Sequence, residues 1–435
     1  MKNPLRFLPA LVLASATIAT SAVAQLNVPS DGSDGALLIT ESTNIDLSLA
    51  TTGAWNTNNS ANAGNGVYDP SQFAVVFKYS SVVIQGGATV TFKNHASRAP
   101  VVWLVSGDVV INGTVSLNGQ DQVQVPLLSE PGPGGFRGGV GNIGGGAGNG
   151  AGFGPGAFNV IASPVNDNGG LGVGNYGQTI GFNGFVGSSP YGNASLIPLL
   201  GGSGGYGGYG RMGGGAGGGA ILIACANTLS VTGTIQANGG YGFDNSSDPY
   251  YYGVENGGSG GGIRLVANTI SGSGTLTCYG GTANGGVPES GGLGRIRIER
   301  VTDTSGFQIV PDASLLSLTN ATSPNIFMPA TGPSVAIETI GGLSAPADPR
   351  SSFGALGADV TLPQLPSTTV TVLTTNVEPQ SVVTVRVTPR SSGNFTDTVA
   401  NLYQTVSQSP LVIRWTANVP VSGGYAAIIA HVVRP

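Results

Sequence analysis

The sequence predicts an all-β fold: a parallel β-helix (β-solenoid) with glycine-rich insertions, followed by a C-terminal β-sandwich of immunoglobulin-like (Ig-like) type. Three observations predict it. Short segments of alternating apolar and polar residues recur between residues 75 and 299, glycine supplies 74 of the 435 residues, and Thr, Val, Pro and Ser become dominant after residue 300. Outside the N-terminal apolar run, no segment has the 3.6-residue period of an amphipathic helix.

Residues 1–24 have the organisation of a secretory signal peptide. Two basic residues precede an apolar run over residues 8–19, and residues 22–24 (Ala-Val-Ala) have the small-x-small pattern of a cleavage site. The run is too short to cross a membrane, and nothing later is longer, so no transmembrane segment is expected. We expect a mature chain that begins at Gln25 and is secreted, either extracellular, at the cell surface or in the periplasm.

Residues 25–300 are predicted to form the solenoid because one unit recurs there. Copies of the unit occupy residues 75–94, 101–119, 221–240 and 263–281, and residues 294–299 open a fifth. Each copy holds two short alternating segments separated by Asn, Gly or Ser-Gly, which is typical of strands joined by tight turns. A unit made only of such strands cannot bury its apolar face alone, so neighbouring copies are expected to stack.

A glycine-rich insertion, residues 131–219, separates the second and third copies. It is almost free of charge, and aromatic residues punctuate its glycines. Glycine loses more backbone entropy on ordering than any other residue, so the insertion is either a flexible coil or a set of extended, polyproline-like rods packed backbone to backbone. The GG-x-GG pattern recurs immediately before the strands, and this favours the ordered rods.

The C-terminal part divides by composition into a linker, residues 301–333, and a β-sandwich, residues 334–435. Turn residues separate alternating segments at the spacing of a small sandwich, with Trp415 as the expected core tryptophan. The predicted strands are residues 334–340, 369–375, 381–388, 411–417 and 425–433.

Several strings in the chain are distinctive. Residues 98–107 read RAPVVWLVSG and residues 130–139 read EPGPGGFRGG, and similar matches occur at 31–35, 75–81 and 294–299. They resemble an uncharacterised group of secreted, glycine-rich bacterial proteins found in environmental lineages such as Planctomycetes and Acidobacteria. The resemblance covers most of residues 30–300 and continues more weakly to the C-terminus. It implies a secreted bacterial protein and no known activity.

Charge and motif content exclude several classes of partner. With 16 basic and 21 acidic residues the chain is mildly acidic, which disfavours nucleic acid. A G-x-G-x-x-G match at residues 172–177 lacks the preceding strand and following helix of a dinucleotide site. Two cysteines and two histidines without ligand spacing do not form a metal site. We therefore expect no cofactor, no metal and no identifiable catalytic residue.

The two cysteines, Cys225 and Cys278, are both expected to point into the core, because each shares a face with buried apolar positions. In a secreted protein they are compatible with one disulfide. The alternative is a pair of buried thiols that act as small apolar residues. The sequence does not supply the Cα separation that decides between them.

Arg295, Arg297 and Glu299 alternate with Ile296 and Ile298 in the fifth copy. The charged residues are therefore predicted to share a solvent-exposed face, as in an edge strand blunted by charge. The alternative is a contact for an anionic polysaccharide, because arginine pairs well with carboxylate and sulfate groups.

Two classes of function remain. The first is a secreted or cell-surface structural or adhesive protein that binds or scaffolds, with extracellular polysaccharide or cell-surface components as partners and with self-association. The second is a carbohydrate-active enzyme, either a polysaccharide lyase or a glycosidase on a β-helix, or a carbohydrate-binding protein. Such enzymes need carboxylates close together, whereas Asp108 is the only carboxylate within the paired strands of the first four copies. Binding is therefore favoured over catalysis.

A tyrosine-rich segment is the best candidate for carbohydrate contact, because aromatic faces stack on sugar rings and carboxylates accept hydrogen bonds from hydroxyls. The alternative is a loop that docks its rings on the solenoid wall. The candidate residues are Tyr250, Tyr251, Tyr252, Asp248 and Glu255.

Order in the glycine-rich insertion is open to a direct test. If the rods pack as predicted, residues 131–219 should resist limited proteolysis by an elastase-type enzyme, with amide exchange protection comparable to that of residues 101–117. Mass spectrometry of the digest locates the cuts. Rapid cleavage throughout the insertion, with the flanking copies left intact, would mean that it is a flexible coil.

Overall fold

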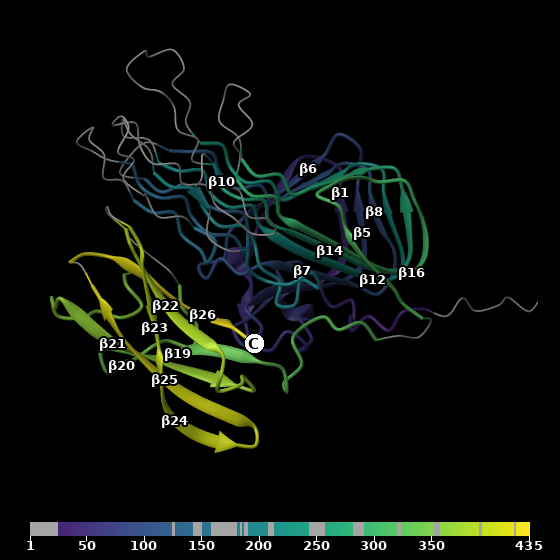
Figure 1. Cartoon of the computed structure of the whole chain (residues 1–435). Helices are drawn as coiled ribbons and strands as arrows, with labels where there is room; N and C mark the ends of the chain where they lie inside the picture. Colours follow the sequence, from purple (N-terminus) through teal and green to yellow (C-terminus); the bar gives the residue numbers. More distant parts are fainter. Residues whose placement is uncertain are drawn as a thin grey trace, which may run out of the picture.

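The computed structural model describes residues 25–123, 127–141, 150–157, 181–182, 185–186, 190–207, 213–242, 257–281, 291–319, 323–350, 357–390, 394–421 and 423–435. The predicted signal peptide lies outside these residues. Within them the chain is built of strands and extended segments (Figure 1), and the helical segments are two single 3-10 turns, Leu47–Leu49 and Ser60–Asn62. The prediction of an all-β fold is confirmed.

Two sheets with mostly parallel strands make up the N-terminal body (Figure 1). Sheet A has the order β18-β16-β14-β12-β7-β5-β4-β3, with β1 and β8 beside β5, and sheet B has the order β17-β15-β13-β9-β6-β2. The strands of sheet A are β1 (Gly35–Ile39), β3 (Thr51–Thr52), β4 (Val67–Asp69), β5 (Ala74–Ile84), β7 (Val101–Val105), β8 (Val109–Ile111), β12 (Ala220–Val231), β14 (Gly262–Gly272), β16 (Arg295–Ser305) and β18 (Ser314–Ser317). Those of sheet B are β2 (Thr43–Asp46), β6 (Thr89–Lys93), β9 (Thr114–Ser116), β13 (Thr234–Gln236), β15 (Thr275–Thr277) and β17 (Gln308–Val310).

The repeated units pair in register. Val101 lies opposite Val75 and Ile221, and Ile221 lies opposite Ile263, so equivalent positions of successive copies are neighbours in sheet A. After its strands in sheet A, each copy continues into one strand of sheet B, as β12 does into β13. Both β7 and β8 pair with β5 on one side and with β12 on the other, so the strand pairings of sheet A form a closed ring. The sequence did not predict this closure.

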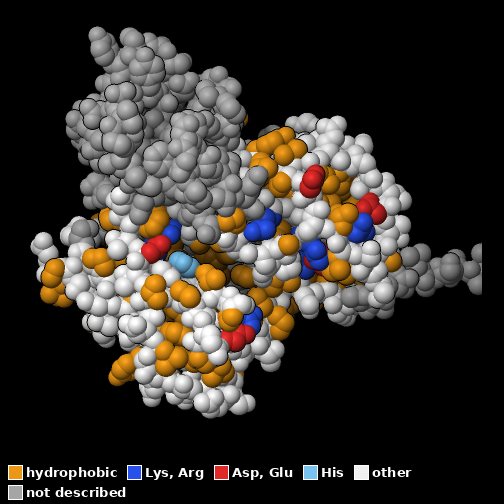
Figure 2. Space-filling model, viewed as in Figure 1, with side chains coloured by type: hydrophobic (Ala, Val, Ile, Leu, Met, Phe, Trp, Pro, Cys, Tyr) orange, Lys and Arg blue, Asp and Glu red, His pale blue; other side chains and the backbone are white. Residues whose placement is uncertain are grey.

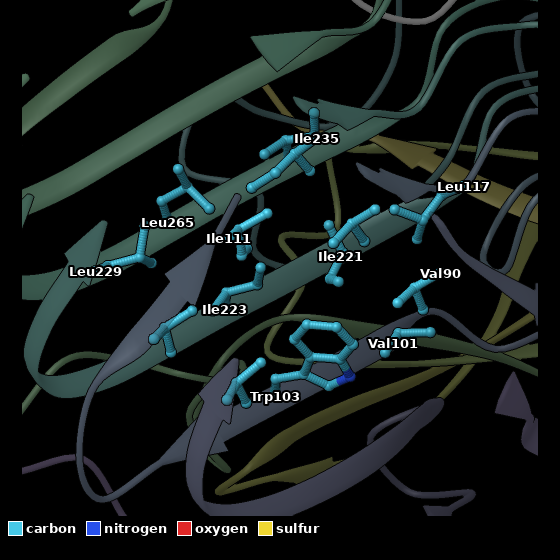
Figure 3. Packing of buried hydrophobic residues seen from close by; sticks show 14 of the residues in the cluster. Val90, Val101, Trp103, Ile111, Leu117, Ile221, Ile223, Leu229, Ile235 and Leu265 are labelled. Atoms are coloured by element: carbon cyan, nitrogen blue, oxygen red, sulfur yellow. The ribbon is translucent and has the colours of Figure 1, made fainter. Parts of the chain in front are cut away.

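A single apolar core lies between the two sheets (Figure 3). Alternate residues of β7 and β12 point into it, among them Val101, Trp103, Ile221 and Ile223, and all four are completely buried. The opposite face of the same strands is also covered, because Leu26, Val28 and Ile326 pack over it. Strands buried on both faces read as continuous apolar runs, which explains the sequence VVWLV of β7.

Glycine-rich segments extend from the strand ends as a bundle of rods. In rod 213–219, the amides of Gly213 and Ala216 donate to carbonyls of rod 118–123, at Val123 and Gln120. The amides of Gly214 and Gly217 donate to a second neighbour, rod 134–141, at Gly139 and Phe136. A partner that recurs every third residue is the signature of the polyproline II helix, so each rod bonds to different neighbours on its different sides.

The close approach of these rods requires glycine. A Cβ on Gly217 would lie 1.8 Å from the carbonyl oxygen of Gly202, and one on Gly261 would lie 1.7 Å from that of Gly219. The described parts of residues 131–219 are thus packed as the ordered alternative predicts. Residues 142–149, 158–180, 183–184, 187–189 and 208–212 of the insertion lie outside the described residues.

The charged face predicted on β16 is not a solvent face. Ile296 and Ile298 enter the core as expected, but Glu299 is only 4% exposed. Its Oε1 accepts a 2.9 Å hydrogen bond from Nε of the buried Arg264, whose other nitrogens donate to the carbonyls of Asn325 and Ile326. The prediction of an exposed edge strand is wrong because β18 pairs beyond β16 and residues 325–326 cover the face.

The C-terminal two-sheet domain, residues 334–433, consists of two antiparallel sheets around a separate core. One sheet has the order β20-β19-β21-β25-β24 and the other β23-β22-β26. Trp415 is buried as predicted and donates from Nε1 to Oγ1 of Thr374 at 2.8 Å. The strands are β19 (Ser334–Ile340), β20 (Leu343–Ser344), β21 (Ser367–Thr375), β22 (Val382–Pro389), β23 (Thr396–Val399), β24 (Asn401–Gln408), β25 (Leu411–Pro420) and β26 (Ala426–Val433). A short hairpin, β10 (Gly181–Phe182) and β11 (Phe185–Val186), is separate from both bodies' sheets.

The packing of the rods predicts an unequal response to alanine. Gly217→Ala should lower the free energy of unfolding by roughly 3 kcal/mol or more, because the methyl group must displace backbone rather than a flexible side chain. Gly306→Ala is the matched control, since nothing lies within 4 Å of its Cβ position. Thermal denaturation followed by circular dichroism compares the two. Equal melting temperatures for both variants would contradict the rod packing.

Candidate functional site

A cavity of about 840 Å³ lies between the rods and the C-terminal two-sheet domain. Figure 2 shows hydrophobic side chains gathered along this junction. The rods and the loops before them contribute Phe136 and Phe153, and β19 and β26 contribute Ile337 and Ile428. Ligand sites are typically concave and mostly apolar with a few polar groups, so this cavity is the first place to search for function among the described residues.

The polar wall on the rod side is an ion-pair group. Nε and Nη2 of Arg98 donate to the two carboxylate oxygens of Glu130 at 3.0 and 3.1 Å, and Nε of Arg137 donates to the same carboxylate at 2.8 Å. Arg98 has a left-handed backbone, with φ of 59°, which this two-pronged contact holds in place. The ion pairs of Arg98 and Arg137 with Glu130 therefore join the strand ends to the rods.

The carboxylates of the opposite wall also accept hydrogen bonds from neighbouring groups of the protein. Glu338 accepts two hydrogen bonds of 2.7 Å from Arg414, and these hold the pKa of Glu338 below its usual value. Asp359 accepts from the backbone N–H of Arg350 at 3.0 Å. A general acid needs a raised pKa at neutral pH. The cavity thus has the shape of a binding site, but its carboxylates do not have the arrangement of an acid and base pair.

Arg386 is the main polar contact that holds the C-terminal two-sheet domain against the rods. Its guanidinium donates to both oxygens of Asp397 at 2.8 and 2.7 Å and lies 3.5 Å from the ring centre of Phe395. Nη1 reaches across to the carbonyls of Gly154 and Pro155 at 3.1 and 2.9 Å. Arg386 therefore links the domain directly to the backbone of the bundle.

Both histidines lie near this junction. His95 stacks on the ring of Tyr68 with 4.1 Å between centroids, and the hydroxyl of Tyr68 donates to Asp348 at 2.8 Å. His431 lies in β26, opposite Thr384, and its buried Nδ1 has no hydrogen-bond partner. Burial lowers the pKa of both imidazoles, with Asp348 opposing the shift at His95, and Arg386 adding to it at His431 while Asp397 opposes it.

The predicted site residues have different outcomes. The carbohydrate candidates Tyr250, Tyr251, Tyr252, Asp248 and Glu255 lie outside the described residues. Cys225 and Cys278 are free thiols, both completely buried, and burial raises the pKa of each. Cys225 lies in β12 of sheet A, whereas Cys278 follows β15 of sheet B. This arrangement corresponds to the alternative of two small apolar core residues.

Asp108 has a local structural contact. Its Oδ1 accepts a 3.0 Å hydrogen bond from the backbone N–H of Thr228. Over the residues that the structure describes, no three His, Cys, Asp or Glu side chains lie close enough together to hold a metal ion. Nor is any helix in those residues long and apolar enough to cross a membrane.

Sequence reasoning did not find which glycine-rich segments lie side by side. Hydrogen bonds join Gly213 to Val123, Gly207 to Gly150, Gly258 to Gly240 and Gly291 to Gly281. The two bonded residues of each pair therefore belong to neighbouring segments of the bundle.

Comparison of the chain with models of protein families, with curated proteins and with solved structures found no match.

The burial of the two histidines predicts a pH dependence of stability. In the unfolded chain each imidazole binds a proton near pH 6.5, whereas in the folded chain protonation requires a lower pH. The unfolded state therefore binds more protons as the pH falls, and stability is lost as pH drops from 7 through the folded pKa values. We expect the melting temperature to be lower at pH 5 than at pH 7.

The double variant His95→Gln/His431→Gln removes every histidine of the chain. Its melting temperature should change less than that of the unaltered chain between pH 7 and pH 5. Glu338→Gln is the control, because that carboxyl titrates below this window. An undiminished pH dependence in the double variant would contradict the assignment.

Proposed function

We propose that the chain is a secreted or cell-surface adhesive or scaffolding protein that binds and does not catalyse. The observation that carries the proposal is the rod bundle, in which backbone amides of one rod donate to carbonyls of several neighbouring rods. The proposal treats the N-terminal body as a parallel β-helix and the C-terminal two-sheet domain as an Ig-like β-sandwich. The in-register parallel pairing of the repeats supports the first of these assignments.

Backbone bonding in several directions suits such a role. A rod whose amides bond alternately to different neighbours cannot bend or rotate without breaking contacts on several sides. A surface formed by such rods loses little entropy when it binds a partner, because its backbone is already fixed. Binding sites on rigid elements are also positioned more accurately than binding sites on loops.

The partner in this proposal is an extracellular polysaccharide. The candidate residues, Asp248 to Glu255, lie in the sequence between rods 237–242 and 257–261, outside the described residues. Three consecutive tyrosines offer apolar ring faces, and the acidic residues beside them accept hydrogen bonds from hydroxyls.

The alternative is a carbohydrate-active enzyme. It would need two carboxylates close together, or one carboxylate beside a basic group at a metal. In the described residues the carboxylates near the cavity, Glu130, Glu338 and Asp359, already accept hydrogen bonds from arginine side chains or backbone. Binding is therefore the better-supported function.

The test is a screen of the chain from Gln25 to Pro435 against insoluble and soluble polysaccharides, with binding and release of reducing ends measured on the same samples. We expect binding to at least one polysaccharide without turnover. The variant Tyr250→Ala/Tyr251→Ala/Tyr252→Ala should bind at least tenfold more weakly, because stacked aromatic contacts contribute about 1 kcal/mol each. Tyr403→Ala, which removes an exposed tyrosine of β24, is the control.

Two outcomes decide against the proposal. Reproducible turnover that disappears in Asp108→Asn or in Asp248→Asn/Glu255→Gln would establish the enzyme instead. Failure of the unaltered chain to bind any polysaccharide or cell-surface preparation would remove the adhesive function.

A further inference from the structure

The outer face of sheet B is an ordered array of uncharged polar side chains. Val115, Ile235 and Leu276 are completely buried in the core, so the residues on either side of each point outward. Thr89, Thr114, Thr234 and Thr275 lie opposite one another across β6, β9, β13 and β15 and form one column. Ser116, Gln236 and Thr277 form a second column, in which Nε2 of Gln236 donates to Oγ of Ser116 at 3.1 Å. Within this column Ser116 and Gln236 are partly exposed, whereas Thr277 is buried.

The array continues onto the rods. The backbone N–H of Asn238 donates to Oδ1 of Asn118 at 2.8 Å, and the N–H of Tyr279 donates to Oδ1 of Asn238 at 2.8 Å. These three residues form a third column. Residues three apart share a face of a polyproline II helix, so Tyr241 lies on the same face as Asn238.

Two tyrosines of this face are about half exposed. Tyr241 is 52% exposed and Tyr279 is 46% exposed, although most other residues of the rods are buried. Threonine columns alone are explained by their contribution to sheet stability. Half-exposed tyrosine rings on a rod whose backbone is fixed by hydrogen bonds at the same residues are not explained in this way, and they supply an independent sign of a ligand.

The chemistry of the face is that of a neutral sugar surface. Its hydroxyl and amide groups both donate and accept, and the tyrosine rings add apolar faces. From the ~3.1 Å rise of a polyproline II rod and the ~4.8 Å spacing of neighbouring chains, the Cα atoms of Tyr241 and Tyr279 are roughly 10 Å apart. None of the residues named in the three columns is charged, and the Lys93–Asp46 ion pair and Asp121 lie beside them, so nothing on the columns selects an anionic ligand.

We infer that this neutral face, made of the three columns together with Tyr241, binds a neutral polysaccharide chain. The inference rests on the proposed polysaccharide-binding function and adds a second surface to it, distinct from residues 248–255. It also specifies the ligand class as uncharged glycans, in contrast to the anionic contact considered for β16.

The experiment measures binding of the chain from Gln25 to Pro435 to cellulose, laminarin and galactomannan, with alginate and pectate as anionic probes. We expect binding to at least one neutral polysaccharide, little change with salt, and weaker binding to the anionic ones. Tyr241→Ala/Tyr279→Ala should weaken binding at least tenfold. Thr114→Val/Thr234→Val/Thr275→Val, which keeps shape and strand preference, should weaken it severalfold.

Tyr403→Ala on β24 and Thr302→Val on the outer side of β16 are matched controls, since both residues are exposed elsewhere. Melting temperatures of all variants should match that of the unaltered chain within a few degrees. If the Tyr241 and Tyr279 variant retains full binding while the Tyr250 to Tyr252 variant loses it, the inference is wrong and the proposed function stands. The reverse result supports the neutral face and removes residues 248–255 from the site.

Two further results would overturn the inference. Preferential binding of alginate or pectate that weakens with salt would mean that charge, not this face, selects the ligand. A freezing-point hysteresis that the threonine variant abolishes, without any loss of glycan binding, would mean that the columns order water at an ice surface instead.

Discussion

Backbone contact between glycine rods is the constraint on which the arrangement of this molecule depends. Amides that donate to a different neighbour at each successive position require rods close enough for direct N–H to carbonyl bonds on several sides. At Gly217, Gly261 and Gly280 a Cβ would come within 1.8, 1.7 and 1.6 Å of a neighbouring carbonyl oxygen. The high glycine content is therefore a packing requirement. It is not evidence of disorder, and it replaces the side-chain core that such a segment lacks.

The rods and the strands support each other. Rod 213–219 leads directly into β12, the strand at the centre of sheet A, and rods 237–242 and 257–261 connect β13 to β14. The strand spacing set by the core therefore sets the spacing at which the rods leave it. A buried arginine, Arg264, fixes one margin of the sheet, where it joins Glu299 to the carbonyls of residues 325 and 326.

Placement of the C-terminal two-sheet domain depends on a few polar contacts between the two bodies. Arg386 bonds to carbonyls of the 154–157 turn, and Tyr68 bonds to Asp348. The carbonyl of Gly154 accepts both from Arg386 and from the backbone N–H of Ala157 in the same turn. The cavity between the bodies is a consequence of this docking, and its charged groups are occupied in maintaining it.

Local pattern by itself determined the strands, the inward residues and the register. Alternation identified Val101, Ile221 and Ile263 as equivalent positions, and the structure pairs them, because a one-residue slip would turn every apolar side chain to the wrong face. The polyproline-like rods could also be predicted from composition, since only glycine permits backbones to approach so closely. Trp415 was identifiable as a core residue from alternation in the last predicted strands.

Only the tertiary structure decided what covers each face. Glu299 reads as exposed in the sequence, yet residues 325–326 fold over it, and no local pattern records a contact between segments so far apart along the chain. Strands β23 and β24 were not predicted, because their apolar residues are exposed and so lack alternating burial. The neutral face of sheet B and the packing of the rods arise in the same way. Each joins residues from several copies, and their proximity exists only after the copies have stacked, since stacking depends on the whole core and not on any one segment.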